Sequence, residues 1–381
     1  MAVATVSTTD PRFQAIKAQH VAFWARAAEN SFLRSAGVFA SSTPIGLPQA
    51  DGSVITHAER LTPDMIDPAA LIEQVERWDP ERLDGSLPAQ GQYLVSVGLG
   101  NVMPVCRPLP KIPWLEAMLG CPIRMTEGHI WNEHYPGDPE EVIRRGAHFE
   151  HDPWLQLYLE FLRQLQDRLS DRFPVSANTL FRGASDLAAA VMGVEEAALG
   201  WIDRPAFMAR LLRVCTDANL TAVEAGYGIL RPFEGGYMSG YGIWAPQPVV
   251  HTQADHSTLI SPAMYAEQIL PYDAEVARGC PMCTFHIHNN GLRVAPYLVE
   301  IPEISAIEVA VDRKPYEIEM LQLIQGHKPL ILDVNFPSLE EADYLLSRLS
   351  PAGLCFNPRF DEETFDALPA DYPGSQAWIL D

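Results

Sequence analysis

Two histidines separated by one residue are the part of the sequence whose spacing points most directly to chemistry. His286 and His288 lie in the stretch TFHIHNNG, residues 284–291, at the end of an apolar run. In a β-strand, residues i and i+2 point to the same side, so both imidazoles would face one small volume. The residues alone leave three interpretations open: a metal-binding pair, a pair of acid–base groups, and a hydrogen-bonded polar pair without a metal.

Polar side chains also mark the ends of the other late strands that the sequence predicts. They are Asp255 and His256 at and after residues 248–255, Asn289 after the histidine pair, Glu308 within 304–312, Asn335 within 329–336 and Cys355 within 353–358. In a βα barrel, the carboxyl ends of the strands form the mouth at which catalysis occurs. Because buried polar groups need partners, this accumulation favours a functional mouth. We interpret Asp255 and Glu308 as candidate catalytic groups.

The remaining candidates in these stretches are substrate-binding residues. His256, Asn289 and Asn335 supply hydrogen-bonding groups at the predicted strand ends. Tyr241 and Trp244, at the end of GYMSGYGIW, are expected to form an aromatic wall for a substrate. The sequence therefore predicts a moderately polar pocket with aromatic walls.

Short β-rich runs alternate with helical segments from about residue 90 onward. The predicted strands are residues 93–100, 128–134, 174–181, 236–244, 248–255, 282–289, 304–312, 329–336 and 353–358. This alternation predicts an α/β fold with a parallel sheet, and the strand number fits a (β/α)8 TIM-type barrel. An open doubly wound sheet is the alternative, which the lack of a Gly-rich phosphate loop disfavours. We expect residues 1–90 to form a helical and irregular extension, and residues 91–381 to form the barrel.

Composition excludes several classes of partner. The chain has 381 residues, with 27 basic and 49 acidic side chains, and a formal net charge of −22. Such a charge argues against nucleic acid and anionic membrane surfaces as partners. We see no apolar run long enough to span a membrane and no secretory signal at the N-terminus. The six cysteines show no disulfide framework. We expect a cytoplasmic protein that acts on a small molecule.

One long segment resembles a known family. The stretch HSTLISPAMYAEQILPYDAEVARGCPMCTFHIHNNG, residues 256–291, is similar to the uroporphyrinogen decarboxylase superfamily, and ILDVNFP, residues 331–337, is similar to a late strand of the same family. The likeness covers roughly residues 95–368 and is firmest from 200 to 360. It implies a βα barrel, in agreement with the alternation of strands and helices.

The resemblance implies two chemistries and a ligand set. The superfamily contains metal-free decarboxylases and zinc-dependent methyltransferases that work with corrinoid proteins. In the methyltransferases, the zinc ligands are a His-x-Cys pair, an acidic residue on the next strand and a late cysteine. By position, the resemblance implies His286, His288, Glu308 and Cys355 here, with His288 standing where the family has cysteine. Nitrogen, oxygen and sulfur ligands suit zinc.

The methyltransferase branch is the expected one. The decarboxylases hold their substrate's carboxylates with an arginine-rich N-terminal segment, whereas Arg12, Arg26 and Arg34 are widely spaced here. We therefore expect a zinc-dependent component that moves a methyl group between a small methylated or methoxylated compound and a corrinoid protein. A decarboxylase of a smaller carboxylic acid is the alternative, and a non-catalytic barrel that binds a small molecule is the third possibility. Three or more convergent arginines at the mouth would favour the porphyrinogen branch.

Overall fold

The structure is a computed structural model that describes residues 3–38, 45–78, 94–177, 181–312, 314–369 and 371–380. Residue 93 of the predicted strand 93–100, and residues 178–180 of the predicted strand 174–181, lie outside these ranges. In the described residues, no helix combines the length and the apolar character that crossing a membrane requires.

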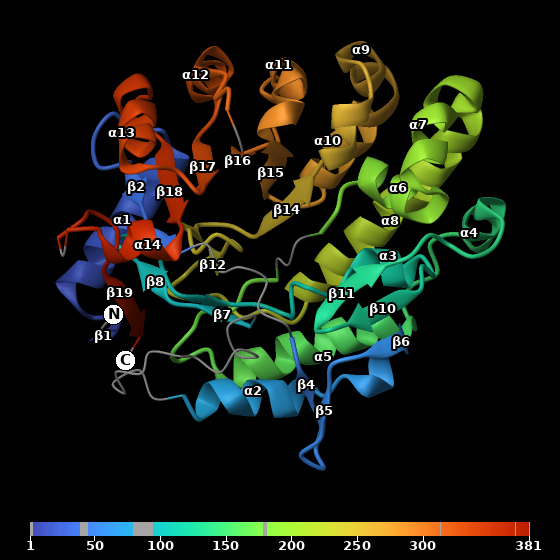
Figure 1. Cartoon of the computed structure of the whole chain (residues 1–381), viewed down its shortest axis with the longest axis horizontal. Helices are drawn as coiled ribbons and strands as arrows, with labels where there is room; N and C mark the ends of the chain where they lie inside the picture. Colours follow the sequence, from blue (N-terminus) through green and yellow to red (C-terminus); the bar gives the residue numbers. More distant parts are fainter. Residues whose placement is uncertain are drawn as a thin grey trace.

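Five consecutive parallel strands form the main wall of the molecule. They are β14 (Val249–Gln253), β15 (Met282–His288), β16 (Ala306–Val311), β17 (Leu330–Asn335) and β18 (Leu354–Phe360), each hydrogen-bonded to the next. Two short N-terminal strands, β2 (Leu33–Arg34) and β3 (Gly37–Val38), then pair with β18 in parallel. Figure 1 shows α10, α11, α12 and α13 outside this arc of strands.

The fold is α/β, of the (β/α)8 TIM-barrel type, as the sequence predicts. Shorter segments continue the wall beyond the main sheet: β9 (Val105–Cys106) pairs with β7 (Val95–Ser96) and forms a parallel bridge to Val175. Within the described residues, the strands do not form one continuous hydrogen-bonded ring. The carboxyl ends of β14 to β18 nevertheless meet at one rim, which is where such barrels place their sites.

The other elements surround this wall. The helices are α1 (Pro11–Trp24), α2 (Pro68–Glu76), α3 (Trp114–Met118), α4 (Pro139–Arg145), α5 (Pro153–Arg168), α6 (Ala184–Met192), α7 (Val194–Asp203), α8 (Pro205–Tyr227), α9 (Pro262–Met264), α10 (Leu270–Arg278), α11 (Ala295–Leu298), α12 (Ile318–His327), α13 (Leu339–Arg348) and α14 (Glu362–Asp366). The remaining strands are β1 (Val3–Val6), β4 (Leu47–Pro48), β5 (Val54–Ile55), β6 (Ala58–Leu61), β8 (Gly98–Leu99), β10 (Ile123–Thr126), β11 (His129–Asn132), β12 (Tyr237–Met238), β13 (Trp244–Ala245) and β19 (Ala377–Leu380).

Asp-Pro pairs set the start of several helices. Asp10, Asp67, Asp138 and Asp152 each precede a proline and accept a hydrogen bond from a backbone N–H in the first helical turn. The carboxylate accepts an N–H that has no partner within the helix. Proline has no N–H, and at the first helical position this costs no helical hydrogen bond. At the start of α2, the carboxylate of Asp67 accepts two such N–H groups, those of Ala69 and Ala70.

The N-terminal residues pair with distant parts of the chain. Besides β2 and β3, strand β1 pairs in parallel with β19, so the two ends of the chain lie side by side (Figure 1). Strand β6 adds to the antiparallel pair of β10 and β11. Residues 3–38 and 45–78 therefore contribute α1, α2 and short strands. The domain division at residue 90 stays a prediction.

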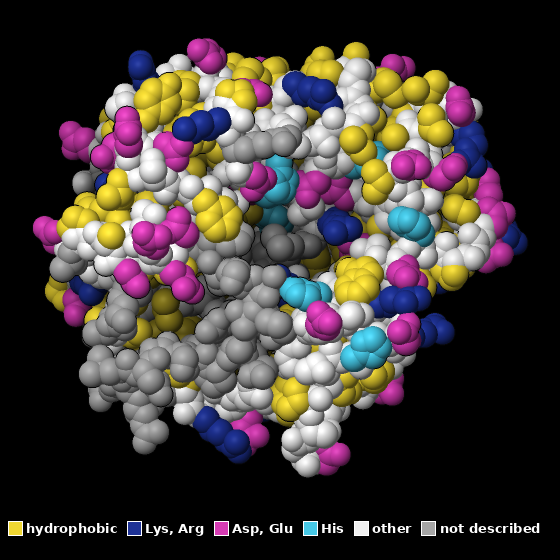
Figure 2. Space-filling view, in the orientation of Figure 1, with side chains coloured by type: hydrophobic (Ala, Val, Ile, Leu, Met, Phe, Trp, Pro, Cys, Tyr) yellow, Lys and Arg dark blue, Asp and Glu magenta, His cyan; other side chains and the backbone are white. Residues whose placement is uncertain are grey.

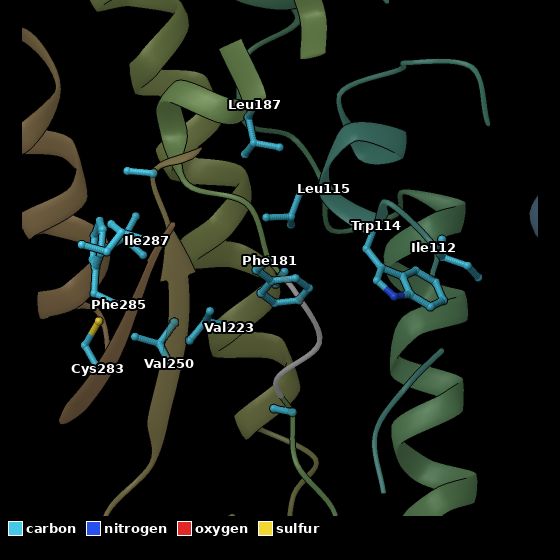
Figure 3. Packing of buried hydrophobic residues seen from close by; sticks show 14 of the residues in the cluster. Ile112, Trp114, Leu115, Phe181, Leu187, Val223, Val250, Cys283, Phe285 and Ile287 are labelled. Carbon is cyan, nitrogen blue, oxygen red and sulfur yellow. The ribbon is translucent and has the colours of Figure 1, made fainter. Parts of the chain in front are cut away.

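Alternation along β15 separates the apolar core from the polar interior. Cys283, Phe285 and Ile287 are fully buried in the main hydrophobic cluster, and Figure 3 shows them along one side of the strand. Since successive side chains point to opposite faces, His286 and His288 face the other way, into the barrel. Burial of the apolar face fixes the register of β15 against its neighbouring strands, and this register places both histidines on the inner face of the barrel.

Candidate metal centre

Two histidines and one aspartate converge at the carboxyl ends of β14 and β15. Asp255 begins a short 3-10 turn two residues after β14, whose Gln253 is paired with His286 in register. The Oδ1 atom of Asp255 lies 3.4 Å from Nε2 of His286 and 3.9 Å from Nε2 of His288. One ligand atom from each of the three residues lies within 4.8 Å of the others. The paired imidazoles predicted from the sequence therefore do share one small volume.

A carboxylate stands behind each imidazole. Nδ1 of His286 contacts Oε2 of Glu308, and Nδ1 of His288 lies 2.5 Å from Oδ2 of Asp312. In a neutral ring, a proton on Nδ1 donates to the carboxylate behind it and leaves the lone pair of Nε2 available to a metal on the side that faces Asp255. Histidines that bind metals usually have such a carboxylate behind the ring, which fixes the tautomer and makes the ligating nitrogen more basic.

The arrangement fits a divalent metal such as zinc. Two atoms that each lie 2.0–2.1 Å from a tetrahedral zinc are about 3.3 Å apart, close to the observed 3.4 Å and 3.9 Å. Oδ1 of Asp255 is buried, and within the described residues its side-chain partners are the two imidazoles, with which it forms ion pairs. Two imidazoles and one carboxylate form a three-ligand set of the kind that leaves a catalytic metal an open position.

Asp255 is held from behind by buried polar groups. Its Oδ2 accepts a hydrogen bond of 2.8 Å from Nε2 of Gln253, which also donates to Asp186. The carboxylate of Asp186 accepts the backbone N–H groups of Asp255 and His256, at 3.2 Å and 2.7 Å. Burial, followed by the nearby Asp255 carboxylate, raises the pKa of Asp186 to about 7. Asp186 thus positions the turn that carries Asp255.

The charges of the cluster stabilise one another. Burial disfavours the imidazolium, but the carboxylates of Glu308 and Asp255 outweigh it and raise the pKa of His286 well above its usual value. Burial acts to raise the pKa of Asp255, but the two imidazoles lower it. With three carboxylates around two histidines, the site carries negative charge that a metal cation would neutralise.

A cavity of about 350 Å³ opens in front of the cluster. Its wall contains Asp255, His286 and His288, the charged groups Lys111, Glu116 and Arg182, the polar groups Asn132 and Gln253, and the apolar groups Pro110, Ile112, Pro113, Ile130 and Trp131. Figure 2 shows a hollow on this face with histidine side chains at its centre. The cavity is large enough for a small organic molecule.

Cys355 does not join this cluster. It occupies the same row of the sheet as His286, but Glu308 and Ile331 lie between them in register. Neighbouring strands are about 4.8 Å apart, so three steps along the sheet carry the thiol well away from the histidines. The thiol is fully buried against Phe23, Leu33 and Ile331 and approaches Oδ1 of Asn357 at 3.5 Å. Burial raises its pKa well above the usual value, which disfavours a thiolate.

Glu308 lies behind His286 rather than within the ligand set. Besides the contact to His286, its Oε2 accepts a hydrogen bond of 3.1 Å from the hydroxyl of Tyr241. Glu308 is buried, and this burial raises its pKa although His286 opposes the rise. Of the four ligands implied by the family resemblance, the structure brings together the two histidines, and Asp255 completes the group.

The aromatic pair predicted as a substrate wall is split. Tyr241 lines a second cavity, whereas Trp244 is buried in a separate apolar cluster with Phe13 and Trp378. The reason is that residues 236–244 form no continuous strand: β12 and β13 are an antiparallel pair, and Gly242 has a φ of +71° between them. A glycine adopts this left-handed conformation without strain, so the chain turns where the sequence indicated a strand.

The other predicted substrate-binding residues, His256, Asn289 and Asn335, form hydrogen bonds with other protein groups. His256 accepts a hydrogen bond of 3.2 Å from the indole of Trp201, and burial lowers its pKa to about 4. Oδ1 of Asn289 accepts the backbone N–H of Asp312, and Asn335 donates to the side chain of Asp312 at 2.8 Å. Both asparagines therefore position the carboxylate behind His288.

Sequence reasoning missed several residues that line the cavity. Arg182 forms an ion pair of 3.1 Å with the buried carboxylate of Glu116, and Lys111 lies nearby on the wall. Trp131, from β11, adds an indole that is 40% exposed. Arg182 directly follows a predicted strand, a position that could have indicated the mouth, but Lys111 and Glu116 carry no such signal in the sequence.

The fold and the site define a TIM-type barrel with a histidine–carboxylate cluster at its mouth. The structure is similar to that of a methyltransferase from Methanosarcina mazei, with a TM-score of 0.58 and 14% sequence identity over 93% of this chain and 94% of that chain. No protein-family model matches the sequence, and no match was found among curated proteins. At this level of identity, the similarity establishes the fold.

Proposed function

We propose that the protein is a zinc-dependent methyltransferase component that takes a methyl group from a small methylated or methoxylated compound and passes it to a corrinoid protein. The observation that carries this proposal is the convergence of Asp255, His286 and His288 at the cavity. The fold shared with a methyltransferase supports it. The family resemblance of residues 256–291 points to the same chemistry.

Asp255, His286 and His288 would hold the metal, with Glu308 and Asp312 fixing the imidazole rings. A bound zinc would supply Lewis acidity to the substrate heteroatom that carries the methyl group. Zinc suits this role because it has no redox chemistry and accepts nitrogen and oxygen ligands in a three-ligand site. The ligand set has one carboxylate and no thiolate, which makes it harder than the thiolate-rich sites implied by the family resemblance.

The side chains of the cavity would bind and orient the substrate. Ile112, Ile130 and Trp131 provide an apolar wall. In the transfer, the bond from the methyl carbon to the heteroatom breaks with its electron pair on the heteroatom. The electron pair of the new bond to carbon would come from the reduced corrinoid of the partner protein. Lys111 and Arg182 line the same cavity, and their positive charges would stabilise the heteroatom as it gains negative charge before protonation.

The direct test is methyl transfer to a reduced corrinoid. Zinc-loaded protein would be mixed with cob(I)alamin and a panel of methoxylated aromatics, including carboxylic acids, and methylated amines. Methylcobalamin formation would be followed by absorbance. We expect formation with at least one compound and a loss of 100-fold or more in His286→Ala. Asp343→Asn, an exposed position on α13, should retain full activity.

The same assay separates the alternatives. If a carboxylic acid in the panel releases carbon dioxide, with or without cobalamin, and no compound is demethylated, the protein is a lyase. If no compound reacts but some bind, the protein is a binding barrel. Either outcome would overturn the proposed function.

A further inference from the structure

A second cavity, of about 480 Å³, shares one lining residue, Lys111, with the cavity at the metal cluster. Among the described residues, its charged lining side chains are Arg107, Lys111 and Arg359, and none of the lining side chains is acidic. The rest of the wall is largely apolar: Val38, Val97, Leu99, Val102, Met103, Val105, Tyr241 and Pro358. In a chain with a net charge of −22, three cations on one apolar cavity are a local reversal of charge.

Arg107 has neutral hydrogen-bond partners among the residues that the structure describes. Its Nη1 donates to the carbonyl of Gly240 at 3.1 Å, and its Nη2 donates to Oγ of Ser96 at 3.3 Å. Both partners are neutral, and no carboxylate of the described residues forms an ion pair with Arg107. Burial, followed by the positive charge of Arg359, lowers its pKa. A guanidinium held near a second one without an anion costs free energy that a bound anion would recover.

Arg359 is partly neutralised by the protein. It forms an ion pair with Asp333, whose other oxygen accepts a hydrogen bond of 2.9 Å from Asn357. The negative charge of Asp333 therefore neutralises Arg359 and not Arg107. The positive charge of Arg107 remains in the cavity.

We propose that this second cavity binds the carboxylate of an organic acid, with Arg107 as its main partner and Lys111 and Arg359 beside it. A planar guanidinium binds a carboxylate through two parallel hydrogen bonds. The apolar walls select an acid with a hydrocarbon or aromatic body over a bare inorganic anion. This assignment of a carboxylate subsite needs no metal at the neighbouring cluster.

The position of the subsite narrows the substrate class of the proposed function, on which this step rests. Because Lys111 lines both cavities, a molecule with its carboxylate at Arg107 would extend past Lys111 towards His286 and His288. The substrate would then be a small acid that carries a methoxy or methylamino group. Tyr241 borders this path: it lines the second cavity and donates its hydroxyl to Glu308 behind His286.

The distribution of arginines disfavours a substrate with many carboxylates. Arg107 and Arg359 share this cavity, and Arg359 is already paired with Asp333. Arg182 lines the other cavity and is paired with Glu116. The three guanidinium groups thus do not converge on one volume, and the surplus charge matches one carboxylate.

Calorimetric titration of matched ligands tests the subsite. Protein freed of metal by chelation and desalting would be titrated with 3-methoxybenzoate, 3-methoxybenzamide and inorganic phosphate. We expect the benzoate to bind at least 10-fold more tightly than the amide and phosphate. Arg107→Gln should weaken benzoate binding by 10-fold or more and leave amide binding unchanged, and Arg107→Lys should recover part of the loss.

Two controls keep the result interpretable. Arg60→Gln removes an exposed arginine elsewhere and should bind benzoate as the wild type does. The thermal unfolding midpoint of each variant shows whether it is folded. Equal binding of benzoate and benzamide, benzoate binding unaffected in a folded Arg107→Gln protein, or tightest binding of phosphate would overturn the proposal. Benzoate that binds through Arg107 but is never demethylated would leave the subsite standing and contradict the methyltransferase function.

Discussion

At the level of single residues, the carboxylate next to each imidazole determines which ring nitrogen is available to bind a metal. Glu308 and Asp312 lie on the Nδ1 side of His286 and His288, so each ring presents Nε2 to Asp255. The spacing of the two histidines was visible in the sequence, because i and i+2 in a strand share a face. The carboxylates behind them were not, because that pairing depends on the register of β15 against β16.

Removing these carboxylates should weaken metal binding without removing a ligand. Glu308→Gln and Asp312→Asn keep the shape of the side chain but lose the charge that holds the Nδ1 proton. Changes of this kind typically cost about 10- to 100-fold in metal affinity. The measurement is zinc affinity by competition with a chromophoric chelator, with Asp343→Asn as the exposed control. Unchanged affinity in both variants would contradict the role assigned to the two carboxylates.

At the level of elements, the sequence predicted the long parallel strands well. The predicted ranges 282–289, 304–312 and 329–336 contain β15, β16 and β17. Such strands are buried on both faces, so their apolar runs are local and easy to read. Cys355 lies on β18, as predicted, but outside the metal cluster. The sequence does not show how many strands separate two residues across the sheet.

The packing of an element onto distant parts of the chain could not be predicted from local sequence patterns. Helix α1 is an example: His20, fully buried, donates Nε2–H to the carbonyl of Asn101 at 2.7 Å and accepts the backbone N–H of Trp244 at Nδ1 at 2.8 Å. Those hydrogen bonds anchor α1 to residues that are 81 and 224 positions away. They require a neutral imidazole, and burial lowers the pKa of His20 to about 4.

Acid should therefore destabilise the fold through His20. The unfolded chain takes up a proton near pH 6.5, whereas the folded chain resists until about pH 4, so stability falls as the pH drops between these values. The shift corresponds to a loss of about 2 kcal/mol in the free energy of unfolding between pH 7 and pH 5. Urea denaturation at both pH values measures the loss, which should shrink by about this amount in His20→Gln. An equal loss in that variant would exclude His20 as the cause.

At the level of the whole molecule, the two ends of the chain are joined in one structure. Strand β19 pairs with β1 and with β8, and its Trp378 is fully buried beside Phe13, Met103 and Trp244. The Trp378 indole donates to the carbonyl of Gly100 at 3.2 Å. None of these four side chains belongs to the metal cluster of Asp255, His286 and His288.

Trp378→Ala should be strongly destabilising and should leave the metal cluster intact in the folded fraction. Truncating a fully buried tryptophan leaves a cavity and costs about 3–5 kcal/mol. Ile202→Ala, at a side chain that is 68% exposed on α7, should change stability by less than about 0.5 kcal/mol. Urea denaturation of both variants provides the comparison. A loss below about 1 kcal/mol for Trp378→Ala would show that the terminal strands contribute little.

The central claim is that Asp255, His286 and His288 bind one divalent metal, and calorimetric titration of zinc into chelator-treated, desalted protein tests it most directly. We predict one zinc per chain for the wild type and for Cys355→Ser, because Cys355 lies outside the cluster. Asp255→Ala and His288→Ala should each weaken binding by 100-fold or more. Absence of zinc binding by the wild type, or loss of binding in Cys355→Ser with retention in His288→Ala, would contradict the account.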